Sequence, residues 1–355
     1  MGLAALIAVG AALASGGSGT DSARLRYLPD ANALRTVSRF GGERIVTVAS
    51  LGDPHVVRAD PRWLATARPL GARAPGWARR MYSLSLLVLH GLVDERSGAA
   101  IAGARDGWAY VWPRDASAVA IALAAAGYRD EARRIVNFLR GLDLGAAARF
   151  ETDGTPVGGR GAQGDAAGWV AAAARAVGLP STTPKPPWQG LADYQENGVG
   201  DFLANAIASG ASHIQALFGT PAGTLAHRAG DPASGLDSAA AWAGRPFPHP
   251  ALYPLVRRTL LQLVAASGRF GMVPSEDWGG GNDPWTAPTA WTAWSLAALG
   301  ERRASLRLMA ELRRDATPAG LLPERVDART GIPTSTTPLA WSHAFAILAL
   351  RRLWL

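Results

Sequence analysis

Apolar side chains recur with helical spacing along most of the chain from residue 76 onward. Between residues 249 and 267 they occupy positions 252, 255, 256, 260, 263 and 264, while arginines occupy positions 257 and 258 on the opposite face. The same three- and four-residue spacing returns throughout this region. It predicts helices near residues 77–92, 114–126, 130–142, 165–177, 197–209, 211–218, 249–267, 287–299, 301–314 and 337–353.

Long segments rich in Gly, Pro, Trp and Asp separate these predicted helices. They cover residues 104–113, 150–162, 179–195, 270–286 and 319–336. Helices of a plain bundle are joined by short connections, whereas long connections of this kind usually carry function. Many paired helices with functional loops gathered at one end predict an all-α fold of the α/α toroid type.

The first 75 residues follow a different pattern. The stretch from Leu3 to Ala14 is apolar and contains the small–x–small sequence of a signal-peptidase site, so residues 1–23 are interpreted as a signal peptide and linker of a secreted or cell-surface protein. Short strands are predicted at residues 43–49 and 55–58, which makes residues 24–75 a β-rich lead-in to a helical catalytic domain over residues 76–355. No apolar run reaches the roughly 18 residues of a membrane-spanning helix.

Composition narrows the classes of function. Of the 355 residues, 48% are hydrophobic and 18% are charged, and the net charge of +8 comes almost wholly from arginine, because Lys185 is the only lysine in the sequence. The arginines are spread singly or in pairs and form no phosphate-binding cluster, so no nucleic-acid partner is predicted. The absence of cysteine excludes disulfides, thiolate nucleophiles and cysteine-ligated metals.

No cofactor is predicted. The six histidines lie far apart and none forms an H-x-x-x-H pair, so no transition-metal site is expected, whereas a structural calcium ion held by loop oxygens remains open. Residues 159–164 match G-x-G-x-x-G, but no buried strand precedes them and no βαβ alternation surrounds them. His343 is interpreted as a support for the last helix and its loop.

Tryptophans in the predicted loops lie beside Arg, Asp and Glu. An indole face can cover the apolar face of a pyranose while charged groups bind its hydroxyls, so the set favours a carbohydrate cleft. Each tryptophan taken singly is better explained as an anchor between its loop and the helix ends. The set consists of Trp108, Trp112, Trp188, Trp278 and Trp285.

Two glutamates on separate loops are candidates for acid–base chemistry. Glu196 precedes a predicted helix, and Glu324 follows Leu322-Pro323 in a later loop. Glycoside hydrolysis needs one carboxyl group to protonate the leaving oxygen and another to activate water or attack. Because the chain holds 28 acidic residues, such a pair is by itself a weak signal.

The order of these segments resembles glycoside hydrolase family 15, which holds glucoamylases, glucodextranases and some trehalases. The resemblance covers residues 76–355 and implies an (α/α)6 barrel that releases glucose from non-reducing ends of α-glucosides with inversion. It rests on Trp112-Pro113-Arg114-Asp115-Ala116, Asp193…Glu196, Pro274-Ser275-Glu276-Asp277-Trp278-Gly279-Gly280, Leu322-Pro323-Glu324 and Pro338-Leu339-Ala340-Trp341-Ser342-His343-Ala344. Gln163-Gly164-Asp165 also resembles a family element that precedes a cleft-facing helix.

The resemblance implies a role for each matching residue. Glu196 would be the general acid and Glu324 the general base, with carboxyl groups about 6.5–9.5 Å apart to leave room for water. The substrate would be an oligosaccharide or polysaccharide, and the protein is expected to be a monomer. The expected substrate-binding residues are Trp112, Arg114, Asp115, Asp193, Trp278 and Trp341.

The chain departs from the family pattern at three places. Gln195 stands where an aromatic residue usually precedes the acid, and Gly158 and Gly159 stand where a tryptophan is usual. An arginine is usual close to the element that begins at Pro274, and here Met272 and Val273 stand beside it. These departures leave open a second interpretation, a degenerate barrel that binds α-glucans without hydrolysing them. A lyase on the same toroid is a third.

Overall fold

The computed structural model describes residues 26–28, 33–37, 43–47, 55–58, 61–103, 107–181, 187–196, 198–318 and 320–355. The predicted signal peptide and linker, residues 1–23, lie outside these ranges. Among the described residues, no helix combines the length and the hydropathy that crossing a bilayer requires.

Helices dominate the described chain, as the hydrophobic spacing predicts. All ten predicted helices are present: α3 (Gly76–Gly91), α4 (Pro113–Ala126), α5 (Arg129–Arg140), α6 (Ala166–Ala176), α7 (Leu203–Ser209), α8 (Ile214–Phe218), α9 (Tyr253–Ala266), α10 (Thr286–Ala298), α11 (Arg302–Asp315) and α12 (Ala340–Leu353). Shorter elements that the spacing does not predict are α2 (Pro61–Leu64) and the 3-10 helices η2 (Ser238–Ala243) and η3 (Pro250–Leu252).

The main differences from the predicted helices lie around α7. This helix begins at Leu203 instead of near residue 197, because the backbone before it pairs with other segments: Leu191 bridges Gly200, and Phe202 bridges Arg228. An unpredicted hairpin follows, made of β5 (Ala226–Arg228) and β6 (Asp231–Leu236). Its turn contains Gly230 at φ 70°, a left-handed conformation that glycine adopts without steric cost.

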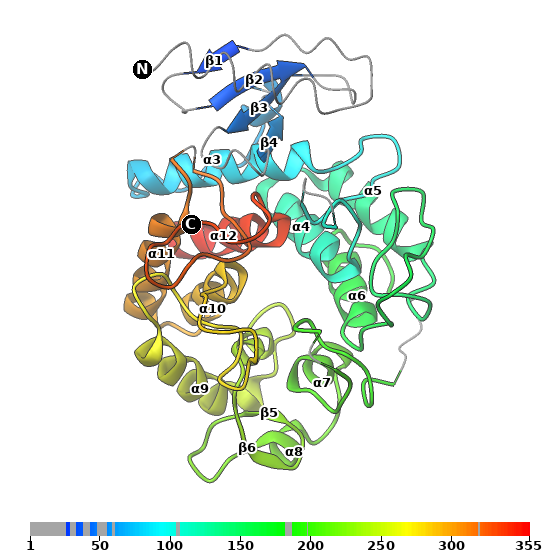
Figure 1. Ribbon diagram of the computed structural model, residues 1–355, viewed down its shortest axis with the longest axis vertical. Helices are drawn as coiled ribbons and strands as arrows, with labels where there is room; N and C mark the ends of the chain where they lie inside the picture. Colours follow the sequence, from blue (N-terminus) through cyan, green and yellow to red (C-terminus); the bar gives the residue numbers. More distant parts are fainter. Residues whose placement is uncertain are drawn as a thin grey trace.

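The helices are arranged as a ring in two layers (Figure 1). In the inner layer each element contacts the next in the order α4, α6, α7, η2, α10 and α12. Contacts between α12 and α4 close the ring. Around them, α5 packs on α4 and α6, α8 on α7, α9 on η2, α11 on α10, and α3 on α12. Nearly every residue of α4, α10 and α12 is buried, whereas α5 and α11 bury one face only, as expected for inner and outer helices.

Aromatic side chains fill the space between the inner helices. Trp169 of α6, Trp242 of η2 and Trp291 of α10 are fully buried. They meet edge to face, with ring centroids 5.1 Å apart for the first pair and 5.4 Å for the second. Phe345 of α12 contacts both Trp169 and Trp291. Part of the high tryptophan content therefore serves the core, and it does not mark a carbohydrate surface.

Glycine allows α6 to approach α7 closely. A Cβ atom at Gly168 would overlap the carbonyl oxygen of Ala208, and one at Gly164 would lie 2.7 Å from the side-chain Cγ of Asn205. Both are closer than a side-chain carbon tolerates, so these positions need a residue without Cβ. This contact fixes the loop that delivers Gln163 and Asp165 to the inner end of α6.

The N-terminal strands form one antiparallel sheet in the order β1 (Arg26–Leu28), β2 (Ala33–Val37), β3 (Glu43–Thr47) and β4 (His55–Arg58). The two predicted strands correspond to β3 and β4, and β1 and β2 are additional. In register, Val46 of β3 faces Leu34 of β2 and Val56 of β4. The sheet lies beside α3, which β4 contacts (Figure 1).

Candidate active site

The start of α4 delivers three of the predicted site residues. Trp112 has an extended backbone (φ −90°, ψ 125°), and Pro113 occupies the first helical turn, where a missing N–H is tolerated. The next two residues are therefore side by side in the first turn. Arg114 and Asp115 are both buried, with Arg114 Nε 3.6 Å from Asp115 Oδ2.

Arg114 organises the polar contacts of this turn. Its Nη1 donates to Gln163 Oε1 at 2.8 Å and to Asp165 Oδ2 at 2.9 Å, and its Cζ lies 4.9 Å from the ring centroid of Trp341 on α12. Burial lowers the pKa of Arg114, but the charges of Asp165 and Asp115 outweigh burial and raise the pKa above its usual value. Arg114 is thus a fixed cation between α4, α6 and α12.

Asp115 is buried, and three neighbouring charges act on its pKa. Burial raises this pKa to about 7; the charge of Arg114 opposes the rise, and the charges of Asp165 and Glu324 add to it. The loop of Glu324 is joined to the start of α12, since the N–H of Leu339 donates to the Leu322 carbonyl at 2.9 Å, and Trp341 of α12 lies over Arg114.

Glu196 has a left-handed backbone, with φ 58°. For a residue with a Cβ atom this conformation costs about 1–2 kcal/mol, and such residues cluster at functional sites. The Glu196 carboxylate accepts hydrogen bonds from Trp112 Nε1 at 3.3 Å and Gln163 Nε2 at 2.9 Å, and it forms an ion pair with Arg160. Segments far apart in the sequence thus converge on this carboxylate.

Arg160 pairs with the predicted catalytic acid Glu196. Its Cζ lies 5.9 Å from the ring centroid of Trp112, and its side chain is 41% exposed. Burial and the neighbouring guanidinium of Arg149 lower the pKa of Arg160, while the charge of Glu324 raises it. The ion pair with Glu196 and the contact with Trp112 place Arg160 beside the start of α4.

The Glu324 side chain is buried, and its backbone is held on both sides. Its N–H donates to the Thr336 carbonyl at 2.9 Å, and its carbonyl accepts from the N–H of Thr286 at 3.0 Å. The Ser335 hydroxyl donates to Glu324 Oε2, and Arg325 Nε lies 3.7 Å from the same oxygen. A hydroxyl donor and a guanidinium both favour the ionised carboxylate.

His343 supports the loop of Glu324, in line with the sequence interpretation. The ring of this fully buried residue accepts a hydrogen bond at Nε2 from the N–H of Leu322 at 2.9 Å, and Nδ1 lies 2.9 Å from the hydroxyl of Ser85 on α3. Because Nε2 is an acceptor, Nδ1 carries the proton and donates to Ser85. Burial lowers the pKa of His343 to about 3, so the ring is neutral.

Asp193 belongs to a buried cluster behind Glu196. Its Oδ1 accepts a hydrogen bond from the N–H of Gln195 at 3.0 Å, and its Oδ2 lies 3.2 Å from Nε2 of His227 on β5. The other ring nitrogen of His227 lies 2.7 Å from Asp277 Oδ1. Burial lowers the pKa of His227, but Asp193, Asp237 and Asp277 outweigh it and raise the pKa to about 9.

The loop tryptophans pack against other aromatic rings. Trp108 stacks on Trp112 with centroids 5.6 Å apart, and Trp278 meets Trp285 edge to face at 5.3 Å. Trp188 contacts Phe218 of α8. These contacts fit the anchoring role, and Trp112 in addition touches Glu196. Trp278 reaches the site indirectly, since the backbone of Trp285 bridges that of the residue after Glu324.

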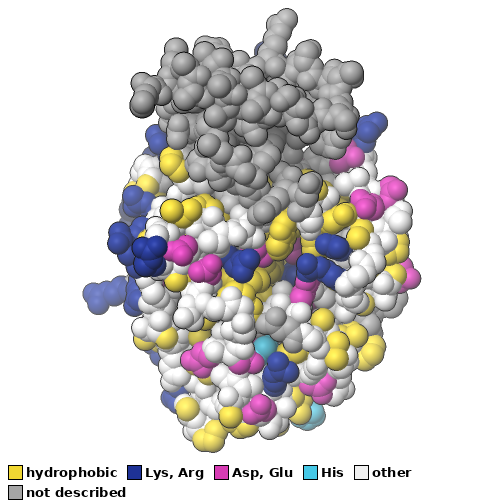
Figure 2. All heavy atoms as spheres, viewed as in Figure 1, with side chains coloured by type: hydrophobic (Ala, Val, Ile, Leu, Met, Phe, Trp, Pro, Cys, Tyr) yellow, Lys and Arg dark blue, Asp and Glu magenta, His cyan; other side chains and the backbone are white. Residues whose placement is uncertain are grey.

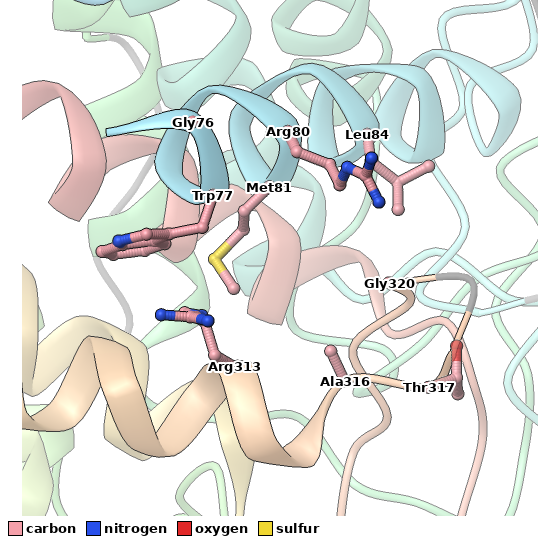
Figure 3. Close-up of a pocket in the computed structure, with 9 residues that line it drawn as sticks. All are labelled: Gly76, Trp77, Arg80, Met81, Leu84, Arg313, Ala316, Thr317 and Gly320. Atoms are coloured by element: carbon pink, nitrogen blue, oxygen red, sulfur yellow. The ribbon is translucent and has the colours of Figure 1, made fainter. Parts of the chain in front are cut away.

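A cavity of 510 Å³ lies elsewhere, between α3 and α11 (Figure 3). No predicted site residue lines it. At one end of it the Arg313 guanidinium lies over the Trp77 ring, with Cζ 4.9 Å from the ring centroid. The remaining lining residues are Gly76, Arg80, Met81, Leu84, Ala316, Thr317 and Gly320. On the face drawn in Figure 2, by contrast, basic, acidic and hydrophobic side chains gather near the middle of the ring.

The structure adds residues that sequence reasoning missed. Arg160 lies in the glycine-rich loop 159–164, whose G-x-G-x-x-G match gives no indication of a carbohydrate site. His227 and Asp237 lie in the hairpin and at the N-cap of η2, which the hydrophobic spacing does not predict. The sequence did indicate Gln163, because this residue lies in the Gln163-Gly164-Asp165 element that resembles a family motif. The others are recognisable only by their neighbours in space.

Comparisons with known proteins give one family and one fold. Residues 76–143 match the model for glycosyl hydrolases family 15. A wild-type glycosidase structure is 18% identical with a TM-score of 0.66, over 83% of this chain and 99% of that one. A bacterial glucoamylase complexed with acarbose is 19% identical with a TM-score of 0.68, over 82% of this chain and 57% of that one. Glucoamylase from Saccharomycopsis fibuligera is 12% identical with a TM-score of 0.64, over 81% of this chain and 97% of that one.

A search of curated proteins gives no significant match. At these identities the structural likeness establishes the fold, and the family match within residues 76–143 supplies the link in sequence. The motifs around Trp112 and Arg114 lie inside the matched range. Over residues 76–143 the chain is thus similar to glycosyl hydrolases family 15, and its fold is similar to the folds of a glycosidase and of two glucoamylases.

Proposed function

We propose that the chain is an exo-acting, inverting glycoside hydrolase that releases glucose from non-reducing ends of α-glucosides. In this proposal the contacts among α4, α6, α7, η2, α10 and α12 form the inner layer of an (α/α)6-type barrel. The 3-10 helix η2 then takes the place of one inner α-helix. The likeness to a bacterial glucoamylase complexed with acarbose supports a carbohydrate substrate.

The observation that carries the proposal is that Glu196 and the loop of Glu324 both reach the start of α4. Glu196 accepts from Trp112 Nε1 and pairs with Arg160, while the Glu324 loop is bonded through Leu322 to Leu339, just before the α12 residue Trp341 that lies over Arg114. Two carboxyl groups that flank one site beside an indole ring are the arrangement that glycoside hydrolysis requires.

Each glutamate has a different chemical task. Glu196 protonates the departing glycosidic oxygen, and Glu324 takes a proton from the water that attacks the anomeric carbon from the opposite face. The Ser335 hydroxyl and Arg325 favour the ionised form that a base needs. Asp115, whose Oδ2 lies 3.6 Å from Arg114 Nε, accepts hydrogen bonds from hydroxyl groups of the terminal sugar.

Arg160 imposes a condition on the acid. A guanidinium beside a carboxylate favours the charged form, whereas a general acid must hold its proton. The Arg160 side chain is 41% exposed and lies over Trp112, so a sugar ring that stacks on this indole takes its place. Substrate binding thereby removes the cation from Glu196 and allows the carboxyl group to be protonated.

The test is product analysis with matched variants. Glu196→Gln and Glu324→Gln should each abolish glucose release from maltooligosaccharides, isomaltose and trehalose, while Glu151→Gln, at an exposed loop position, should leave it unchanged. Proton NMR of the first product should show β-glucose, because inversion at an α-linkage yields the β-anomer. Near-normal turnover in a glutamine variant would remove that residue from its role, and α-glucose would refute inversion.

A binding protein without hydrolysis is the second candidate. The Arg160–Glu196 pair and Gln195 favour it, since a cation fixed on the acid would prevent proton donation. In that case the wild-type chain binds maltooligosaccharides in calorimetry and releases no glucose from any of the three substrates. Measurable release by the wild-type chain would exclude this candidate.

A further inference from the structure

Ligand atoms of four buried side chains converge behind Glu196. Nε2 of His227 lies 3.2 Å from Asp193 Oδ2, 3.6 Å from Asp237 Oδ2 and 3.3 Å from the side-chain amide nitrogen of Gln195. The four residues are at most 6% exposed. Ligand atoms of Asp193, His227 and Asp237 all lie within 4.8 Å of one another.

We propose that this cluster is a structural site for one divalent transition-metal ion of the zinc type, bound by Asp193, His227, Asp237 and the side-chain carbonyl of Gln195. In a tetrahedral site with metal–ligand bonds of about 2.0–2.2 Å, neighbouring ligand atoms are about 3.3–3.6 Å apart. The three separations measured from His227 Nε2 span 3.2 to 3.6 Å. The histidine spacing in the sequence does not predict this site, because its four ligands come from three separate segments and only one of them is a histidine.

An ion pair alone leaves this cluster unsatisfied. A protonated His227 carries one proton on Nε2 and donates it to one oxygen, yet two carboxylate oxygens face this atom. Asp237 Oδ2 is fully buried and accepts no hydrogen bond from any described residue. The amide nitrogen of Gln195, itself a donor, faces the same ring nitrogen. A cation at the common point binds both oxygens and leaves no buried acceptor unpaired.

Rotation of the Gln195 amide completes the ligand set. With the amide turned, Oε1 faces the cluster, and the amide nitrogen takes the position now 2.9 Å from the Ser275 hydroxyl oxygen. Ser275 accepts this new hydrogen bond while its own proton goes to Asp277 Oδ1, 2.7 Å away. Every polar group then has a partner.

The surroundings have the features of a metal-binding histidine. Nδ1 of His227 donates to both carboxylate oxygens of Asp277, at 2.7 and 2.9 Å, which leaves Nε2 as the lone-pair donor. The Tyr194 hydroxyl donates to Asp237 Oδ1 at 2.7 Å and orients that carboxylate. Three carboxylates and the guanidinium of Arg228, 3.6 Å from Asp277, sum to two negative charges, which one divalent ion neutralises.

Four protein ligands in a buried place make a structural ion, not one that activates water. Two of the ligands, Asp193 and Gln195, lie within the three residues before Glu196, whose backbone is left-handed. The ion would therefore hold this loop in the conformation that presents Glu196. The metal site can be tested separately from glycoside hydrolysis, because metal content is measured without substrate.

Metal content and cobalt spectroscopy test the site. The full chain, stripped with a chelator, loaded with Zn²⁺ and dialysed, should retain one ion per chain by elemental analysis. Co²⁺ should give the intense visible absorption of a tetrahedral site. Asp237→Asn and His227→Gln should lower Zn²⁺ affinity at least tenfold, while His213→Asn, at an exposed histidine on the start of α8, should not change it.

Each result decides the proposal. Absence of retained Zn²⁺ and of a cobalt spectrum in the wild-type chain would overturn it, and this measurement does not depend on whether the variants fold. Full affinity in a folded Asp237→Asn or His227→Gln variant would overturn these ligands. Loss of Zn²⁺ binding in both, with retention in His213→Asn, would establish them. Glucose release can fail without affecting any of these outcomes.

Discussion

Acid should destabilise the folded chain in part through one buried imidazole, that of His343. The ring is fully buried, accepts the N–H of Leu322 and donates to Ser85. Protonation of Nε2 would break the first of these hydrogen bonds and place a charge in the core. His343→Gln removes the titrating group and keeps a side-chain acceptor near the position of Nε2.

The size of the effect follows from the two pKa values of His343. Burial lowers the pKa to about 3 in the folded chain, whereas an unfolded chain has a value of about 6.5. Between these values the unfolded state binds more protons, so the free energy of unfolding falls as the pH falls. This contribution is fully present above about pH 6.5; about 2 kcal/mol of it is lost at pH 5 and about 4 kcal/mol at pH 3.

The assay compares variants across pH and does not use the raw profile. Carboxyl groups such as Asp115, whose pKa is raised to about 7, titrate in the opposite direction and mask the histidine in the wild-type curve. Urea unfolding of the wild type and His343→Gln at pH 7 and pH 5 should therefore show the wild-type advantage shrinking by about 2 kcal/mol. His213→Asn, at an exposed histidine, is the control and should show a constant difference. A constant difference for His343→Gln as well would refute a buried neutral ring.

Three further changes test the site and the core. Arg160→Ala should move the basic limb of the kcat/KM profile for glucose release to higher pH, because it removes the cation beside Glu196; an unchanged limb would contradict the pairing. Glu196→Gly should be about 1–2 kcal/mol more stable to urea than Glu196→Ala, because glycine adopts φ 58° without strain; equal stability would argue against a left-handed backbone there. Trp291→Ala should lower the free energy of unfolding by about 3–5 kcal/mol, whereas Arg257→Gln, which breaks an exposed ion pair with Glu301, should change it by less than about 1 kcal/mol.

Local sequence determines most of the helices because their signals are local. The spacing of apolar residues in α9, the proline at the start of α4 and the glycine after its end are each contained within a few turns of chain. The structure of the segment before α7 is not predicted by such local signals. Ala192 bridges Gln163 and Phe202 bridges Arg228, and a long-range bridge leaves no periodic trace in its own segment.

The sequence by itself determined that the chain is mainly helical, that its loops carry paired carboxylates, and in which order the Trp112, Glu196 and Glu324 segments occur. Only the tertiary structure decided that Arg160 pairs with Glu196 beside Trp112 and that His227 gathers Asp193, Asp237 and Asp277. The physical reason is that helix formation depends on neighbours three and four residues apart, whereas these charges interact through space. Their positions are set by the packing of α4, α6, α10 and α12 around the aromatic core, which no short stretch of sequence encodes.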